Sequence, residues 1–164
     1  MVELFETIVI EGPVQRTFDL ARSIEVHLLG NDHWGERATA GTCTGLIGLG
    51  ESVTWRARHF GVRQSLTSAI TAWRPPFYFQ DTMLCGAFKS MQHDHYFLAL
   101  PVAEGEAPRT EMRDVFRFAA PLGVLGVVAE RVVLRRYMRA LLRERNEVIR
   151  QVAANGEWRR YVPE

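Results

Sequence analysis

The chain has 164 residues, of which 47% are hydrophobic and 24% are charged, and its formal net charge is +1. This length and composition predict one globular domain with a single hydrophobic core. The near-neutral charge argues against nucleic acid, and against an acidic membrane surface, as the main partner.

The N-terminal region predicts a strand, two short helices and then a series of strands. The stretch "LFETIVIE" at residues 4–11 alternates as a strand does, and Pro13 suits the first turn of a helix. Apolar residues then recur at helical spacing over residues 14–30, with a break expected near Arg22-Ser23. Further strands are predicted at residues 36–45, 51–60 and 61–73.

The second half predicts more strands and one long helix. Strands are expected at residues 77–84, 87–102 and 110–121. A long helix is expected over Gly123–Ala154, with an apolar stripe at helical spacing formed by Leu134, Met138, Leu141, Val148 and Val152. We place a single domain at residues 1–156 and expect residues 157–164 to be a loose tail.

Two absences in the sequence bear on location. Acidic residues stand where a signal peptide has basic ones, and no apolar run is long enough to span a bilayer. We therefore expect a cytoplasmic protein without stable membrane insertion.

The order of elements predicts an α+β fold. Strands in immediate succession with short turns form an antiparallel sheet, here of about seven strands. A sheet with one apolar face must be covered, and the C-terminal helix has the length and the stripe to cover it. A sheet that curls around this helix leaves room for a cavity between them.

The stretch "SMQHDHYFLAL" carries the residues of greatest chemical interest. On a strand His93 and His95 share a face with Met91 and Phe97. They suit three roles: metal ligands, acid–base groups, or the polar part of an otherwise apolar pocket. The next strand places Asp114 on one face with Met112 and the phenylalanines 116 and 118, and Asp81 is similarly placed beside Phe79.

The layout, together with "ITAWRPPFYFQD", "GAFKSMQHDHYF" and "TEMRDVFRFAAPLGVLG", resembles the helix-grip, START-like superfamily, also called SRPBCC, over nearly the whole chain. It is most similar to the bacterial ligand-binding branch, which includes polyketide cyclase- and dehydratase-like proteins. That branch has an aromatic-x-His-x-His-x-Phe strand, which His93, His95 and Phe97 match and Met91 does not. The resemblance implies a cavity that binds a lipid, sterol, quinone or polyketide. It does not imply a reaction.

The spacing of the histidines argues against a metal site. Metal-binding cupins place a glutamate four or five residues after a His-x-His pair, and here those positions hold Ala99 and Leu100. The other histidines stand at no recognisable spacing from the pair. We therefore expect no metal and no other cofactor.

The resulting hypothesis is a non-catalytic carrier or sensor of a small hydrophobic molecule, with a homodimer left open. The alternative is a cyclase- or dehydratase-like enzyme that uses His93, His95 and Asp114 as acid–base groups in the same cavity. No nucleophile motif accompanies them, so binding is favoured over catalysis. Plain core packing explains the aromatic candidates equally well. The residues expected at the ligand are Trp55, Phe79, Asp81, Met91, His93, His95, Phe97, Met112, Asp114 and Phe116.

Overall fold

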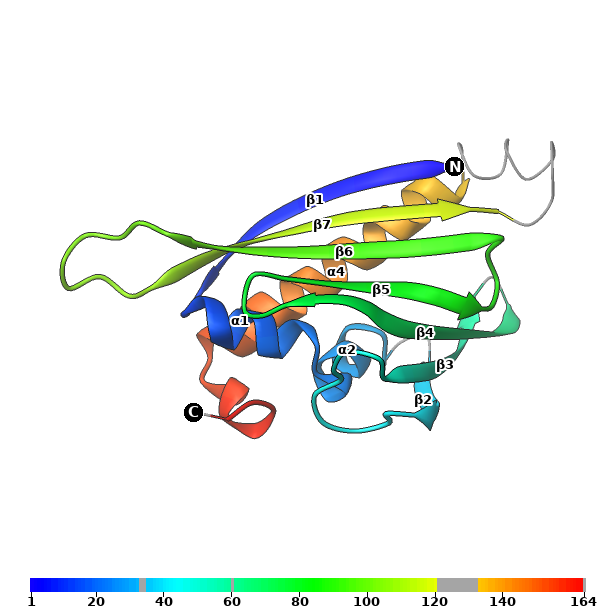
Figure 1. The fold of residues 1–164 in the computed structure, drawn as a ribbon, viewed down its shortest axis with the longest axis horizontal. Coiled ribbons are helices and arrows are strands. Elements are labelled where there is room, and N and C mark those ends of the chain that lie inside the picture. The colour runs from blue at the N-terminus through cyan, green and yellow to red at the C-terminus, as the bar shows by residue number, and fades with distance from the viewer. Residues whose placement is uncertain (33–34, 60, 121–132, 164) are drawn as a thin grey trace.

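Seven antiparallel strands form one curved sheet in the order β1-β7-β6-β5-β4-β3-β2 (Figure 1). The computed structural model describes residues 1–32, 35–59, 61–120 and 133–163. The strands are β1 (Val2–Glu11), β2 (Arg37–Gly41), β3 (Ser52–His59), β4 (Val62–Arg74), β5 (Tyr78–Cys85), β6 (Ser90–Leu100) and β7 (Arg109–Ala119). The helical elements are α1 (Val14–Ala21), α2 (Ile24–Gly30), α4 (Arg135–Ala154) and the 3-10 turn η3 (Glu157–Arg160). The α+β fold predicted from the order of elements is confirmed.

The break between α1 and α2 lies where the sequence predicts it. Arg22 ends α1, and Ser23 has an extended backbone and begins α2. The Ser23 hydroxyl accepts a hydrogen bond from the backbone N–H of Val26 at 3.4 Å. Ser23 therefore caps α2, since this N–H in the first turn has no carbonyl partner within the helix.

Strand β6 is an interior strand of the sheet, between β5 and β7. Its register aligns His93 with Asp81 on β5 and His95 with Asp114 on β7. Directly opposed residues in an antiparallel pair point to the same face, so this register gathers two histidines and two aspartates from three strands.

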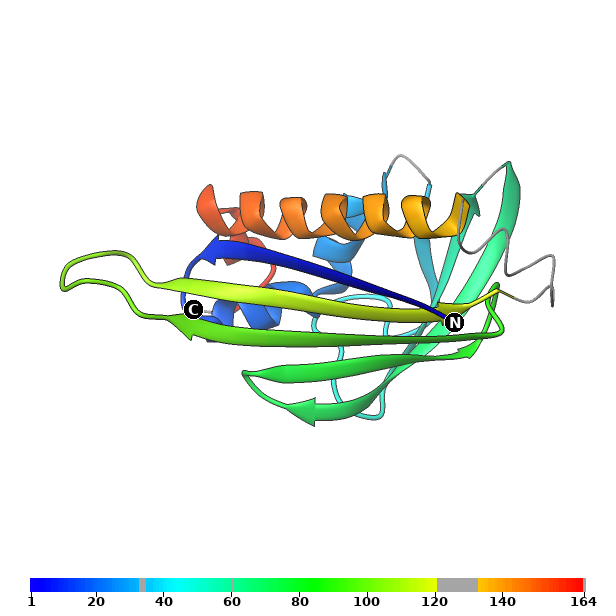
Figure 2. The same ribbon diagram turned by 90° about the horizontal axis from the view of Figure 1, so that it is seen from above.

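Helix α4 lies along the concave face of the sheet, where it packs against β1, α1 and α2 (Figure 2). Its buried positions are Leu142, Arg145, Asn146, Ile149, Val152 and Ala153. The five residues of the predicted stripe all lie on this inner side. Val152 is buried, Leu134, Met138 and Val148 pack against the core, and Leu141 borders the cavity described below. The prediction did not include the two polar residues, Arg145 and Asn146, that also face the core.

The predicted start of the long helix, at Gly123, lies outside the described residues. Among the helices that are described, none combines the length and apolarity needed to cross a membrane.

Two predictions were wrong. Strand β2 ends at Gly41 and does not continue to residue 45, because the φ of 74° at Gly41 turns the chain out of the extended conformation. Only glycine fits at this turn, since a Cβ there would lie 2.0 Å from the Ser52 carbonyl oxygen. The C-terminal tail is not loose. Trp158 and Val162 are buried in the main core, and the Arg16 guanidinium stacks 3.6 Å from the centroid of the Trp158 ring.

Candidate functional site

A cavity of about 360 Å³ lies between the sheet and the helices α2 and α4. Its wall is mainly apolar and includes Val53, Leu66, Ile70, Met138 and Leu142. This volume falls within the range of small-molecule pockets, about 300–1,000 Å³.

The structure divides the ten residues expected at the ligand into two groups. Seven border the cavity: Trp55, Phe79, Asp81, Met91, His93, His95 and Phe116. Three do not border it. Phe97 and Met112 are buried in the main core, and Asp114 lies on the far side of the histidines. A ligand in the cavity would therefore not contact these three side chains directly.

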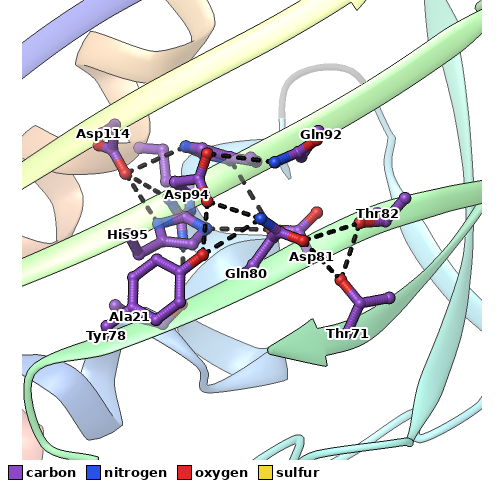
Figure 3. Close-up of polar contacts among 12 residues, drawn as sticks. Ala21, Thr71, Tyr78, Gln80, Asp81, Thr82, Gln92, Asp94, His95 and Asp114 are labelled. Atoms are coloured by element: carbon purple, nitrogen blue, oxygen red, sulfur yellow. Dashed lines mark hydrogen bonds and ion pairs between the residues drawn. The ribbon is translucent and has the colours of Figure 1, made fainter. Parts of the chain in front are cut away.

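Asp81, His93, His95 and Asp114 form what we call the His–Asp cluster. Nε2 of His93 lies 3.0 Å from Oδ1 of Asp114, and Nε2 of His95 lies 3.0 Å from Oδ2 of Asp81. The two imidazole centroids are 3.8 Å apart. Figure 3 shows His95 between the two aspartates.

Exposure falls steadily from one side of the cluster to the other. The side chain of Asp81 is 19% exposed, against 8% for His93, 1% for His95 and 0% for Asp114. The Asp81 carboxylate is therefore the group of the cluster most open to a ligand. Asp114 lies at the buried end, in contact with both histidines.

Helix α4 holds Asp114 in place through the two polar residues on its core face. Asn146 donates from Nδ2 to Oδ2 of Asp114 at 2.6 Å. The Arg145 guanidinium lies 3.9 Å from Oδ1 of Asp114 and donates to the Ala21 carbonyl at 2.7 Å. These contacts supply the partners that a buried carboxylate requires.

Burial and charge act in opposite directions on the cluster. Burial alone would raise the pKa of Asp114, but the contacts and charges of His93 and His95 outweigh it and hold that pKa well below its ordinary value. The pKa of Asp81 is lowered for the same reason. Burial lowers the pKa of His93, and the nearby charge of His95 adds to this effect. At neutral pH both carboxylates are ionised and His93 is neutral.

His95 has a carboxylate oxygen beside each ring nitrogen. Nδ1 lies 2.8 Å from Oδ1 of Asp114 in a direction poorly suited to a hydrogen bond, and Nε2 lies 3.0 Å from Oδ2 of Asp81. A neutral imidazole carries one N–H and an imidazolium carries two, so only the charged ring donates to both aspartates.

A second polar group borders the cavity near α2. His27 lies 3.0 Å from Oε2 of Glu36, and Asn31 donates to the same oxygen at 2.6 Å. The ring of His27 stacks on Trp55, with the centroids 4.1 Å apart. Burial alone would raise the pKa of Glu36, but the charge and hydrogen bond of His27, together with Asn31, lower it.

Asp94 stands between the two histidines in the sequence, so its side chain projects from the opposite face of β6. Its Oδ1 accepts hydrogen bonds from the Tyr78 hydroxyl at 2.6 Å and from Nε2 of Gln80 at 2.7 Å, as Figure 3 shows. Arg117 donates to Oδ2. Burial alone would raise the pKa of Asp94, but these three donors lower it.

We expect Asp94→Asn to lower the free energy of unfolding at pH 7 by roughly 1–3 kcal/mol, since charged hydrogen bonds are lost. A depressed carboxyl pKa stabilises the fold above the ordinary pKa, about 3.9, and this stabilisation is lost as the pH falls through the folded value. The deficit of the variant should therefore shrink between pH 5 and pH 2, by about that same amount. Urea unfolding across this range measures it, with Glu104→Gln in the exposed 101–108 loop as the control. A deficit that is constant with pH would contradict the prediction.

Sequence reasoning missed several residues at this site. Arg145, Asn146 and Glu36 were not named as candidates. A weak signal exists for Arg145, since positions 142, 145, 149 and 152 lie on one helical face. The sequence contains no comparable signal for Glu36.

The comparisons with known proteins concern structure alone. Neither a family model nor a curated protein matches the sequence. The fold matches the START superfamily protein from Mycobacterium smegmatis with a TM-score of 0.63 and 9% identity, covering 92% of this chain and 96% of that one. The chain has a START-like fold.

Two other structures share the START-like fold. The protein TTHA0849 from Thermus thermophilus matches with a TM-score of 0.65 and 16% identity, covering 93% of this chain and all of that one. The major latex-like protein 151 from Panax ginseng matches with a TM-score of 0.58 and 13% identity, over 93% of this chain and 97% of that one. The START-like resemblance noted in the sequence is thus confirmed for the fold.

Proposed function

We propose that this protein binds a small hydrophobic molecule in the cavity between sheet and helix, as a carrier or sensor. The observation that carries the proposal is the cavity of about 360 Å³, with its mainly apolar wall and the His–Asp cluster on one side. The START-like fold supports this proposal, because the superfamily that the sequence resembles includes proteins that bind lipids, polyketides or quinones.

The cluster gives the cavity a polar anchor. The Asp81 carboxylate and the imidazole of His93 border the cavity among apolar neighbours. A few fixed polar groups in such a wall orient a ligand and select among head groups. We therefore expect an amphipathic ligand, with a polar end near Asp81 and a hydrocarbon body along the apolar wall.

Filling the cavity should abolish binding. Ala57 lies on the inner face of β3 and borders the cavity, so Ala57→Phe places a ring in the space of the ligand. We expect affinity for anilinonaphthalene sulfonate, and for a fluorescent fatty acid, to fall at least about tenfold, or about 1.4 kcal/mol.

Arg56→Phe is the matched control, because Arg56 is exposed on the other face of the same strand. Thermal unfolding of both variants monitors the fold, since overpacking alone can destabilise a core. If the folded Ala57→Phe protein bound both probes like the wild type, the proposal would be wrong.

A second candidate is acid–base catalysis of the cyclase or dehydratase kind. The observation in its favour is His93, which borders the cavity and contacts an ionised aspartate at 3.0 Å. In this arrangement Asp114 orients His93 and does not touch the substrate. Turnover of a bound polyketide that is lost in His93→Gln, with binding retained, would establish this function over simple carriage.

A further inference from the structure

Three side chains of the His–Asp cluster offer donor atoms to a common point. One donor from each of Asp81, His93 and His95 lies within 4.8 Å of the other two. Oδ2 of Asp81 is 3.0 Å from Nε2 of His95 and 3.8 Å from Nδ1 of His93. Ligand atoms around a tetrahedral zinc ion, each about 2.1 Å from the metal, lie about 3.4 Å apart. The observed separations lie on either side of that value.

The remaining ring nitrogens both lie close to Asp114, although only that of His93 is oriented for a hydrogen bond. Nε2 of His93 and Nδ1 of His95 lie 3.0 Å and 2.8 Å from the same oxygen, Oδ1. Histidines that bind metals commonly donate their second N–H to a carboxylate, which fixes the tautomer and turns the other nitrogen toward the metal. Here one buried aspartate lies beside both histidines at once.

The same geometry gives each donor a free lone pair at the common point. Nε2 of His95 lies 3.0 Å from Oδ2 of Asp81, and Nδ1 of His93 lies 3.8 Å from the same oxygen. In the neutral tautomers that carry the proton on the nitrogen beside Asp114, both of these ring nitrogens are electron-pair donors, as a metal ion requires.

The charges agree with a cation. Two carboxylates belong to the cluster, that of Asp114 fully buried and that of Asp81 partly so, while Arg145, 3.9 Å from Asp114, is the cationic side chain that contacts it among the described residues. Apart from the histidines, the two carboxylates carry one negative charge more than Arg145 offsets, and this favours a cation.

We infer that Asp81, His93 and His95 form a binding site for one divalent first-row transition metal ion, with Asp114 as the residue that positions both histidines. Two imidazoles and one carboxylate suit zinc, cobalt, nickel or ferrous iron. The argument against a metal from the sequence considered only donors at a recognisable spacing from the His-x-His pair along the chain. The third donor comes from the neighbouring strand, where the register pairs Asp81 with His93.

The site keeps an open coordination position. All three donor residues border the cavity, so the face of the ion away from the protein is directed at the ligand space. Three protein ligands with one open position are typical of metal sites that bind a substrate or water. A molecule with a carboxylate, enolate or hydroxyl oxygen at its polar end is the chemical class that fits.

The test is a titration of chelator-treated protein with Co²⁺ and with Zn²⁺ alone, without an organic ligand. We expect one equivalent of Co²⁺ to bind and to produce the visible absorption bands of a low-coordinate Co²⁺ ion. Zn²⁺ should compete with it for the same site, because zinc readily takes imidazole and carboxylate ligands in a four-coordinate arrangement. Asp81→Asn and His93→Gln should lose stoichiometric binding. Asp114→Asn should weaken metal affinity about 10–100-fold while the protein remains folded.

His27→Gln is the matched control. It removes an imidazole beside a carboxylate from the same cavity, at 3.0 Å from Glu36, and should leave Co²⁺ binding unchanged. Absence of stoichiometric binding in the wild type, or an equal loss in His27→Gln, would overturn the inference. The hydrophobic-probe experiment runs in excess chelator, so failure of the metal site and failure of the ligand cavity give different results.

Discussion

Asp114→Ala should lower the free energy of unfolding by roughly 3–5 kcal/mol, the usual cost of removing one partner from a buried charged network. Asp114 has no exposed side-chain surface and contacts His93, His95, Asn146 and Arg145. Its loss leaves the amide of Asn146 and the N–H of His93 without their acceptor. It also leaves the Arg145 guanidinium without its counter-charge in the cluster.

Chemical denaturation at pH 7 measures this effect, and Glu111→Ala is the matched control on the same strand. Glu111 is partly exposed and pairs with the exposed Arg113, so its removal should change stability by less than about 0.5 kcal/mol. Similar small losses in both variants would show that the cluster does not stabilise the fold.

Phe18→Ala should cost about 3–5 kcal/mol as well, for a different reason. Phe18 lies on α1, is 1% exposed and makes edge contacts with Trp73, Phe79 and Phe97 at centroid distances of 5.0, 5.6 and 5.4 Å. Phe79 in turn stacks on His95 at 4.2 Å. The void left by the ring therefore lies directly behind the aromatic residue that supports the cluster.

Phe5→Ala makes the same chemical change at a side chain that is 58% exposed, and we expect it to change stability by no more than about 0.5 kcal/mol. Urea unfolding of the two variants measures the difference. Equal stability of Phe18→Ala and Phe5→Ala would show that α1 contributes little to the core.

The sequence was most informative where one face of a strand is buried. Strand β6 covers the stretch "SMQHDHYFLAL", inside the predicted range 87–102, and Met91, His93, His95 and Phe97 are all buried at alternate positions, as the pattern predicted. The same alternation placed Asp81 and Asp114 on the inner face beside the histidines. Period-two patterning thus predicted the members of the His–Asp cluster, although not their distances.

The sequence was least informative where tertiary contacts override the local pattern. Arg145 and Asn146 are polar residues on a buried helix face, and nothing local to α4 shows that an aspartate of β7 opposes them. Asp81, the third donor of the metal site that we propose, was not identified as a possible ligand for a related reason. Spacing along the chain cannot show a partner that strand pairing supplies, as it does for Asp81 and His93.

Strand β6 carries buried polar groups on both of its faces, with the Asp94 carboxylate on one and two imidazoles on the other. A shift of pairing by one residue would exchange these faces. It would carry Asp94 into the apolar cavity and turn both histidines toward Tyr78 and Arg117. A single-residue insertion within β6 should therefore be tolerated far less well than one in the exposed 101–108 loop, which leaves the alignment of β5, β6 and β7 unchanged.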